Sequence, residues 1–514
     1  MSVNVNVENR QIYKNISANI LAFLFQFVTS FCVSPIIVEH VGASAYGFVN
    51  IANDFVSYAA IFASIINSVA ARFIANEFYC KNYKKANYYF NSLIMANVIL
   101  SAIIGIISGI LIYKLEYILV IPTSLITDVK ISFALVFASY IVTLITMVYS
   151  TSIFIVNRTD IQGVRNIIKS FLTLTVTIVF LIFVSVKIYW IALGTLVSSI
   201  VVAIMNIGLT NRITPMLKFC VKHVRIEYAI EVAKSGGWMA IISFSGVLLR
   251  GIDLTLANIL LGDYEMGLLS IARTMPNNMI SVIGTLAPIF TPVFIAFHAQ
   301  GKKRELVEKI DNSINIISLI IFVPISIFIV YSVDFYMLWQ RGLKQEEVYV
   351  VSLISIISIM QSYFDASTAT MSQVSVVVNK LRIPVLVSLG CGVASVGMEI
   401  FLLKYTDMGI YAIVLPTTIV LIARYIFFNP IYVSYCLSVP IKTFYYTSLK
   451  NWISIPVLIV IMKFIRKGLP IKNWWDLILN IGVCFMVGEL IMLVLYRIDI
   501  VKKGIGICDE RRRL

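Results

Sequence analysis

The chain has 514 residues, of which 59% are hydrophobic and 13% charged, and its mean hydropathy is +0.91. Soluble proteins carry about twice this share of charged residues, roughly 25%, so the composition excludes a soluble enzyme. It also excludes a disordered or nucleic-acid-binding chain, because long apolar runs separate the basic residues that give the net charge of +15. The sequence therefore predicts an all-α polytopic membrane protein.

Apolar runs bounded by charged residues, glycine or proline predict about 14 transmembrane helices, because about 20 apolar residues suffice to cross the hydrocarbon core. The run at 266–296 contains Pro288 and Pro292, so we expect a helix that bends there. The first run lacks a small-residue cleavage site and is interpreted as a retained span rather than a signal peptide. The predicted spans are residues 15–38, 48–71, 88–112, 131–156, 170–186, 188–210, 237–260, 266–296, 311–332, 349–377, 383–403, 409–434, 451–465 and 475–496.

The distribution of Lys and Arg predicts the orientation, because short cytoplasmic loops are enriched in these residues. If the N-terminus is cytoplasmic, 28 of the 41 basic residues lie in cytoplasmic segments, ten lie in outer segments and three lie within spans. Four of the ten outer residues gather at 463–472, the one segment that disagrees with the rule. We therefore expect both termini in the cytoplasm.

Three short motifs recur in the same order in the second half of the chain, at offsets of 220, 222 and 222 residues. Three ordered matches at a nearly constant offset indicate an internal repeat. The matched segments are 41–52 with 261–272, 156–161 with 378–383, and 188–191 with 410–413.

The repeat predicts two six-helix lobes. Because six is even, both copies enter the membrane from the same side, so we expect the lobes to be related by a pseudo-two-fold axis along the membrane normal. The second lobe is followed by helices 13 and 14. The predicted divisions are an N-lobe at 1–212, a cytoplasmic linker at 213–236, a C-lobe at 237–436, and the last two helices with a basic tail at 437–514.

The three basic residues within spans are all arginines: Arg250, Arg273 and Arg424. The first two lie twelve residues before and eleven after Gly262, which places both about 17 Å from the outer loop at 1.5 Å per residue. A diphosphate needs planar, permanently charged donors, so we interpret the three arginines as its binding residues. The alternative is that Arg250 and Asp253, three residues apart on one helix face, neutralise each other and that Arg424 snorkels toward the cytoplasm.

Acidic residues within the spans form a second candidate set, namely Asp54, Asp253 and Asp365. Intramembrane acids carry a coupling proton or cation in many transporters. The alternative role is to act as charge partners of the arginines.

Polar residues also recur at helical spacing and predict a sugar-accepting cavity, with hydrogen bonding between helices as the equal alternative. The seven cysteines and three histidines are too scattered for a disulfide framework or a metal site, and nothing in the sequence points to a cofactor. The candidate cavity residues are Asn50, Asn53, Ser57, Asn277 and Asn278.

Two six-helix lobes, about 14 spans and a Gly-x-x-x-x-Gly motif at Gly42–Gly47 and again at Gly262–Gly267 resemble the polysaccharide-biosynthesis flippases. That family belongs to the superfamily of the MATE exporters and the lipid-linked peptidoglycan-precursor flippases. The first-lobe stretch from Val41 to Gly47 and the basic loop with Lys81, Lys84 and Lys85 are similar to the Wzx-type oligosaccharide flippases.

The resemblance implies a bacterial inner-membrane protein that moves an undecaprenyl-diphosphate-linked oligosaccharide, such as an O-antigen or capsule repeat unit, outward by alternating access. The partners that it implies are this lipid-linked oligosaccharide, membrane lipids, a coupling proton or sodium ion, and the polysaccharide polymerase machinery.

Other functions fit the sequence less well. An ATP-driven pump would need a phosphate-binding loop, and Ala296 stands where that motif needs glycine before Gly301-Lys302. A membrane glycosyltransferase or polymerase would need a convergent catalytic cluster, and no Asp-x-Asp motif occurs, so we expect a protein that is not an enzyme. A MATE-like exporter of cationic drugs is the closer alternative, but it would favour acidic cavity residues over arginines.

Overall fold

The computed structural model describes residues 21, 24–25, 27–156 and 158–511, and of residues 159 and 496–511 it describes the backbone alone. The start of the first predicted span and the basic residues Arg512 and Arg513 lie outside the described residues. Throughout the described ranges the regular structure is helical, without a strand. The all-α class is therefore confirmed.

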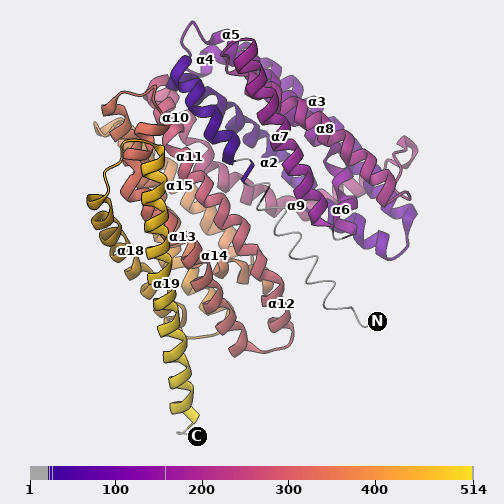
Figure 1. Ribbon diagram of the computed structural model, residues 1–514. Coiled ribbons are helices and arrows are strands. Elements are labelled where there is room, and N and C mark those ends of the chain that lie inside the picture. The colour runs from indigo at the N-terminus through magenta and orange to yellow at the C-terminus, as the bar shows by residue number, and fades with distance from the viewer. Residues whose placement is uncertain (1–20, 22–23, 26, 157, 512–514) are drawn as a thin grey trace. The chain divides into compact units, whose positions relative to one another are not determined.

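Figure 1 shows the helices in chain order. After an apolar helix at Phe27–His40 they are α2 (Ala43–Tyr79), α3 (Tyr83–Tyr113), α4 (Leu115–Ile118), α5 (Ile126–Thr146), η1 (Met147–Ser150), α6 (Thr151–Ile155), α7 (Thr159–Phe183), α8 (Tyr189–Ile213), η2 (Val221–His223), α9 (Ile226–Gly246), η3 (Val247–Gly251), α10 (Asp253–Leu260), α11 (Asp263–Leu286), η4 (Ala287–Phe290), α12 (Thr291–Ala299), α13 (Lys303–Trp339), α14 (Gln345–Val377), α15 (Arg382–Tyr405), α16 (Tyr411–Ala423), η5 (Arg424–Phe428), α17 (Asn429–Leu437), α18 (Lys442–Gly468) and α19 (Trp474–Arg511).

Within the described residues, 13 helices are long and apolar enough to cross a membrane, and the shorter helix Phe27–His40 falls on the remaining predicted span. The prediction of about 14 membrane helices is therefore confirmed. Several helices exceed the apolar runs, because polar turns continue the helix beyond the ~20 residues that the hydrocarbon core requires; α2 and α13 have 37 residues each. Likewise α9 begins at Ile226, so the non-helical part of the predicted linker is residues 214–225, with one short turn.

The proline-rich span is interrupted as expected. Regular α-helix ends at Leu286, a 3₁₀ turn covers Ala287–Phe290, and α12 begins at Thr291. Pro288 and Pro292 each fall in the first two positions of the element that they open, and each lacks the N–H that would continue the hydrogen-bond ladder from the preceding turn.

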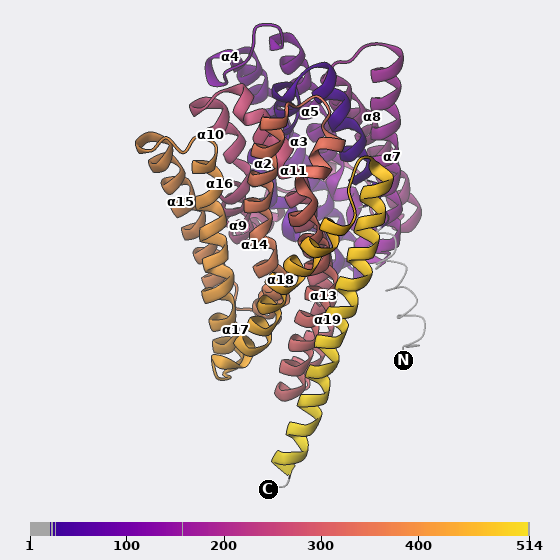
Figure 2. The ribbon, with the colours of Figure 1, turned by 60° about the vertical axis from the view of Figure 1, so that its left-hand side comes forward.

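Contacts group the chain into two compact units, which are described separately. Unit 1 comprises Met1–Ile271 and Val385–Ile413, and unit 2 comprises Ala272–Pro384 and Val414–Leu514. In unit 1, α2 packs against α3, α5 and α9, and α8 packs against α5 and α7. In unit 2, α13 packs against α14, α18 and α19, and α19 runs alongside α13 in Figure 2. The two repeat-based lobes remain a prediction of the sequence.

The two copies of the glycine motif meet inside unit 1. A Cβ on Gly47 would lie 3.0 Å from the Cα of Gly267, and a Cβ on Gly267 would lie 2.5 Å from the backbone carbon of Ala43. Three residues further along each copy, the Asn50 amide donates to the Ser270 hydroxyl over 2.6 Å. The backbone contact at Gly267 leaves no room for a side chain, so glycine there allows the starts of α2 and α11 to approach this closely.

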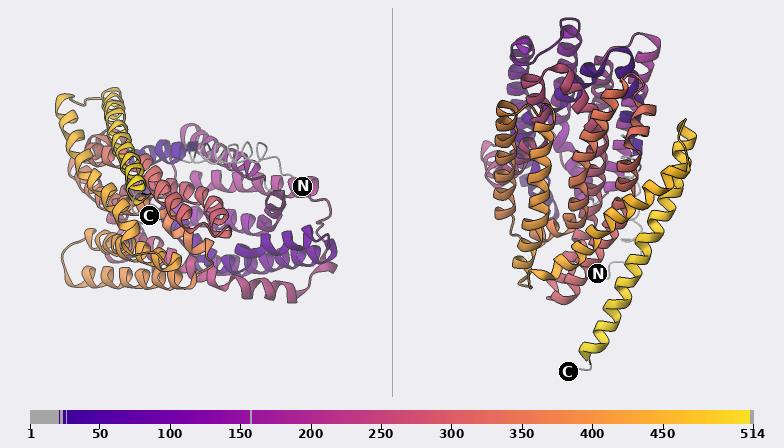
Figure 3. Two further views of the ribbon diagram at one scale, coloured as in Figure 1. Left: turned by 90° about the horizontal axis from the view of Figure 1, so that it is seen from below. Right: turned by 90° about the vertical axis from the view of Figure 1, so that its left-hand side faces the viewer.

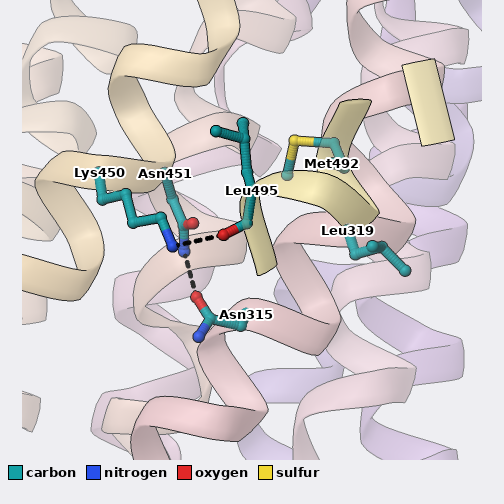
Figure 4. Close-up of a pocket in the computed structure, with 6 residues that line it drawn as sticks. All are labelled: Asn315, Leu319, Lys450, Asn451, Met492 and Leu495. Atoms are coloured by element: carbon teal, nitrogen blue, oxygen red, sulfur yellow. Dashed lines mark hydrogen bonds between the residues drawn. The ribbon is translucent and has the colours of Figure 1, made fainter. Parts of the chain in front are cut away.

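Polar side chains of α18 attach this helix to α13 and to α19 in unit 2. The Asn451 amide donates to Asn315 Oδ1 over 3.1 Å, and the Lys450 ammonium donates to the Leu495 carbonyl over 2.8 Å (Figure 4). These groups line a cavity of about 10 Å³, close to the smallest that holds one water molecule. The six lining residues are Asn315, Leu319, Lys450, Asn451, Met492 and Leu495.

The last two helices, seen together in Figure 3, also explain part of the basic segment 463–472. Arg466 near the end of α18 forms an ion pair of 2.9 Å with Asp334 of α13 and donates to the Val330 carbonyl. One of the four basic residues that disagree with the charge rule is therefore paired with an acid of unit 2.

Candidate functional site

Two of the three intramembrane arginines lie in π turns. Arg250 is the fourth residue of η3 (Val247–Gly251), and Arg424 is the first residue of η5 (Arg424–Phe428). A π turn is rare and is frequent at functional sites, because it widens the helix and disturbs the regular ladder of backbone hydrogen bonds. Both side chains are half-buried.

The π turn at Arg250 changes how this residue relates to Asp253. The predicted common face assumes an unbroken α-helix, but the π turn ends at Gly251 and α10 begins at Asp253. The wider turn rotates residues three apart away from a shared face. Asp253 itself is fully buried, whereas Arg250 is half-buried.

Tyr58 of α2 joins this region to the candidate residues of its own helix. Its hydroxyl donates to the Gly251 carbonyl over 2.5 Å and lies 3.0 Å from the Thr255 hydroxyl. The phenol is also within electrostatic reach of the carboxylates of Asp54 and Asp253. Unit 1 therefore brings two of the three predicted acids to the surroundings of one half-buried tyrosine.

The polar stripe on α2 divides into different roles. Asn50 makes the bond between helices to Ser270, which matches the alternative interpretation of this stripe. Asn53 donates to the Val49 carbonyl of its own helix and is exposed, and Ser57 donates to the Asp54 carbonyl.

Arg273 belongs to unit 2 and directly follows Ala272, whose backbone carbonyl has no partner N–H within its own helix. Pro276 has no N–H for the carbonyl of Ala272, four residues earlier on α11. The Ser355 hydroxyl of α14 lies 2.7 Å from this carbonyl and 2.8 Å from the Val351 carbonyl of its own helix, so its one proton is shared between the two acceptors. The Tyr336 hydroxyl of α13 lies 3.4 Å from the Ala272 carbonyl and 2.8 Å from the Ser355 hydroxyl. The half-buried Arg273 is thus fixed to a segment that two neighbouring helices hold in place.

Within the described residues, the side chains of Asn277 and Asn278 on α11 form no hydrogen bond to another helix. Asn278 donates to the Thr274 carbonyl of its own helix, and Asn277 is exposed.

Arg424 and Asp365 lie at the same level on neighbouring helices of unit 2. The Thr418 hydroxyl donates to the Ile357 carbonyl, and the Asn429 amide donates to the Thr368 hydroxyl, each across 61 residues. This constant offset places Arg424 level with residue 363 of α14, two residues from Asp365. Arg424 is also 13 residues from either end of the span Tyr411–Leu437, or about 20 Å, which is mid-membrane depth.

An apolar groove of about 240 Å³ lies beside Tyr58 in unit 1, between α2, α3 and α5. Its rim includes Phe62 and Ile107, which are 60% and 58% exposed, so the groove opens at the surface of the unit. The lining residues are Phe55, Tyr58, Ala59, Phe62, Ile104, Ile107, Ser108, Leu111 and Phe137.

Sequence reasoning missed several of these residues. Tyr58 and Pro276 were hidden because aromatic residues and prolines are common in spans, and only the fold shows which carbonyl each of them affects. In the part of the chain that the structure describes, no cluster of three or more His, Cys, Asp or Glu side chains is placed to hold a metal ion.

Comparison of the sequence with known proteins finds a relative among membrane proteins. No model of a known protein family matches the sequence. The chain is 24% identical over 426 residues to the uncharacterized membrane protein EpsK of Bacillus subtilis (strain 168), which covers 82% of each protein.

Solved structures of similar fold are those of transporters and a flippase. A multidrug resistance MATE family transporter in its inward-facing conformation aligns with a TM-score of 0.69 and 12% identity, over 80% of this chain and 95% of the transporter. The lipid II flippase MurJ in an inward closed conformation aligns with a TM-score of 0.66 and 14% identity, over 93% and 98%. A MOP superfamily transporter from Pyrococcus furiosus, described by a reversed polarity of its binding pocket, aligns with a TM-score of 0.61 over 83% and 96%. The protein is thus a multi-pass membrane protein with the MATE and MurJ fold.

Proposed function

We propose that this protein is a flippase that moves an undecaprenyl-diphosphate-linked oligosaccharide from the cytoplasmic to the outer leaflet of a bacterial inner membrane. An O-antigen or capsule repeat unit fits this description, and alternating access is the mechanism. The observation that carries the proposal is permanent positive charge in π turns within the spans, at Arg250 and Arg424, in a protein of the MATE and MurJ fold.

The arginines suit the diphosphate for a chemical reason. A guanidinium group keeps its charge within the membrane and presents paired donors that match phosphate oxygens. A charged residue within a span is costly, so it is retained where it faces a cavity, a partner or a substrate. In this proposal Arg250, Arg273 and Arg424 bind the diphosphate.

Other parts of the substrate need different surroundings. The polyprenyl chain is apolar, and the groove beside Tyr58 supplies an apolar surface that opens at the side of unit 1. The glycan needs hydrogen-bonding groups, and the exposed amides of Asn53 and Asn277 are accessible for that purpose, together with Asn50, Ser57 and Asn278. Delivery of the exported unit to a polysaccharide polymerase would complete the pathway step.

Coupling is assigned to the acids. Asp54, Asp253 and Asp365 are proposed to bind a proton or a sodium ion or to balance the arginines during transport. The two roles are separable, because a coupling acid changed to asparagine abolishes the dependence of transport on the ion gradient, whereas a charge partner leaves that dependence intact.

Export of cationic drugs is the second candidate. It is favoured by two fully buried acids of unit 1, Asp253 and Glu399, the latter accepting a 2.9 Å hydrogen bond from Ser395. Buried negative charge attracts cations, and a MATE transporter shares the fold.

The test measures the leaflet in which the lipid-linked oligosaccharide resides. Cells in which the R250A/R273A variant replaces the wild-type protein should accumulate the lipid-linked glycan in the cytoplasmic leaflet. A membrane-impermeant reagent that labels glycans cannot reach it there. Each lost charge-assisted bond removes about 1.5–3 kcal/mol, so outward movement should fall at least about ten-fold.

The matched control is K114A/K404A. It removes two exposed lysines from segments predicted to lie outside the membrane, in contrast to the two arginines within the spans. It should leave outward movement unchanged. Normal export by R250A/R273A at wild-type protein level would contradict the diphosphate role of this pair. An unaltered glycolipid distribution with raised drug sensitivity in cells that lack the protein would favour the exporter.

A further inference from the structure

The connection between α8 and α9 is an extended segment held to α3 by side-chain amides. We call residues 214–225 the strap. Asn87 and Asn91 lie one turn apart on α3, and each uses both ends of its amide to bind the backbone of alternate strap residues. The bonds are Asn87 to the Met216 carbonyl (2.7 Å) and the Lys218 N–H (2.9 Å), and Asn91 to the Lys218 carbonyl (3.0 Å) and the Cys220 N–H (2.6 Å).

A further bond fixes the far end of the strap. The N–H of Arg225 donates to the Ser92 hydroxyl over 2.8 Å. The Leu217 side chain is 1% exposed and packs into the core of unit 1 formed by α2, α3 and α9. The strap therefore has a fixed backbone, and its outward side chains form a defined surface rather than a mobile loop.

The depth of the strap follows from the composition of α3. Residues 93–113 are 21 residues without a charge, long enough to span about 31 Å, which is the thickness of the hydrocarbon core. The preceding stretch, 83–92, is polar and aromatic, and Tyr88 and Tyr89 pack on Tyr228 with ring centroids 5.6 and 4.7 Å apart. Tyrosines mark the interface between hydrocarbon and water. Since the strap binds residues 87–92, it lies at the level of the lipid headgroups.

The outward side chains of the strap alternate between apolar and basic. Met216, Phe219 and Val221 are 53%, 51% and 62% exposed. The basic residues between and after them, Lys218, Lys222 and Arg225, are exposed as well. This end of α3 is the one that the distribution of Lys and Arg predicts to be cytoplasmic, the leaflet surface that is negatively charged.

We propose that the strap is a docking site for anionic phospholipid headgroups of the cytoplasmic leaflet. The basic side chains bind the headgroup phosphates, and the apolar side chains enter the boundary between headgroups and acyl chains. The docked lipid fixes unit 1 at the level of that leaflet. This inference does not depend on the identity of the transported substrate.

The test is lipid binding to the purified full-length protein in detergent, measured by native mass spectrometry with phosphatidylglycerol and with phosphatidylcholine. The variant is K218Q/K222Q/R225Q. Each lost charge-assisted bond to a headgroup phosphate removes about 1.5–3 kcal/mol, so the variant should lose at least about ten-fold in affinity for phosphatidylglycerol and little for phosphatidylcholine. Wild-type binding should also weaken as salt rises, because the attraction is screened.

The matched control K114Q/R341Q/K404Q also removes two lysines and one arginine, but from exposed positions outside the strap. It should retain phosphatidylglycerol binding. The proposal is overturned if the strap variant binds phosphatidylglycerol like wild type, or if the control loses as much. It is equally overturned if a short-chain polyprenyl diphosphate displaces phosphatidylglycerol at an equal or lower concentration, since the strap would then serve the substrate. Size-exclusion profiles and thermal melting of the variants establish that these exposed substitutions leave the fold intact.

Discussion

The carbonyl of Ala272 allows a direct test of how the segment carrying Arg273 is held. Because Pro276 has no N–H, this carbonyl depends on the Ser355 hydroxyl at 2.7 Å and, more weakly, on the Tyr336 hydroxyl at 3.4 Å. Ala272, Tyr336 and Ser355 are all fully buried. Leaving a buried acceptor without its donor costs about 1–3 kcal/mol. Since Tyr336 stays in place, we expect Ser355→Ala to lower the free energy of unfolding by about 1–2 kcal/mol.

The decisive variant is Pro276→Ala, which returns an N–H to α11 in position to bond to the Ala272 carbonyl. In that background Ser355→Ala still removes the 2.8 Å partner of the Tyr336 hydroxyl, but the Ala272 carbonyl keeps a donor. The substitution should therefore cost about 1 kcal/mol less than in the wild-type background, which is the coupling energy that the cycle measures. The assay is unfolding of the purified protein in mixed micelles, followed by circular dichroism. Ser375→Ala is the control, because this buried hydroxyl of α14 bonds to its own helix. An equal cost of Ser355→Ala in both backgrounds, or an equal cost of the control, would refute the reasoning.

Three further changes should have measurable effects on stability in the same assay. A Cβ on Gly267 meets the backbone of Ala43, whereas a Cβ on Gly47 first meets the flexible Met266 side chain. Gly267→Ala should therefore lower the free energy of unfolding by about 1–3 kcal/mol, and Gly47→Ala should lower it clearly less. An equal loss of stability in the two variants would contradict this. The Asn258 amide bonds to both the N–H and the carbonyl of Val120, so Asn258→Ala should cost about 1–3 kcal/mol. A neutral effect would show that other contacts hold the loop between α4 and α5. Asn451→Ala removes the bonds from α18 to α13 and should cost about 1–2 kcal/mol, while thermal melting unchanged from wild type would argue against this attachment.

The membrane helices were predictable because the bilayer imposes a simple requirement on sequence. A run of about 20 apolar residues is sufficient to cross the hydrocarbon core whatever its neighbours are, so the spans followed from composition alone. The helix ends did not, because polar turns at the ends of α2 and α13 continue the helix where hydropathy no longer carries a signal. The strap is a similar case. Its position depends on the amides of Asn87 and Asn91, whose partners lie more than 120 residues away.

The candidate site was predictable residue by residue but not as an arrangement. An arginine within an apolar run is visible in sequence because of its cost in the membrane. The π turns at Arg250 and Arg424 were not visible, since no residue type encodes them. The level match of Arg424 and Asp365 depends on the register of α14 against α16 and α17, which two hydrogen bonds between helices define. The face shared by Arg250 and Asp253 stays a prediction; it presumed an unbroken helix, whereas the chain has a π turn at Val247–Gly251.

Symmetry and charge follow different patterns in this chain. Asn50 bonds to Ser270 and Gly47 lies against Gly267, so residues 220 positions apart meet their own counterparts. If a two-fold axis relates the two copies, as the sequence predicts, a residue that meets its counterpart lies near that axis, because the rotation carries any residue far from the axis away from its counterpart. The intramembrane arginines are not repeated in the first copy. At an offset of 220, Arg250 and Arg273 correspond to Ser30 and Asn53, and at an offset of 222, Arg424 corresponds to Val202. All three counterparts are uncharged. Packing around the axis constrains both copies alike, whereas a single anionic substrate needs only one set of cations. If the arginines bind the diphosphate as proposed, the second copy alone supplies that set, which is the asymmetry expected of anion recognition built onto a scaffold that both copies share.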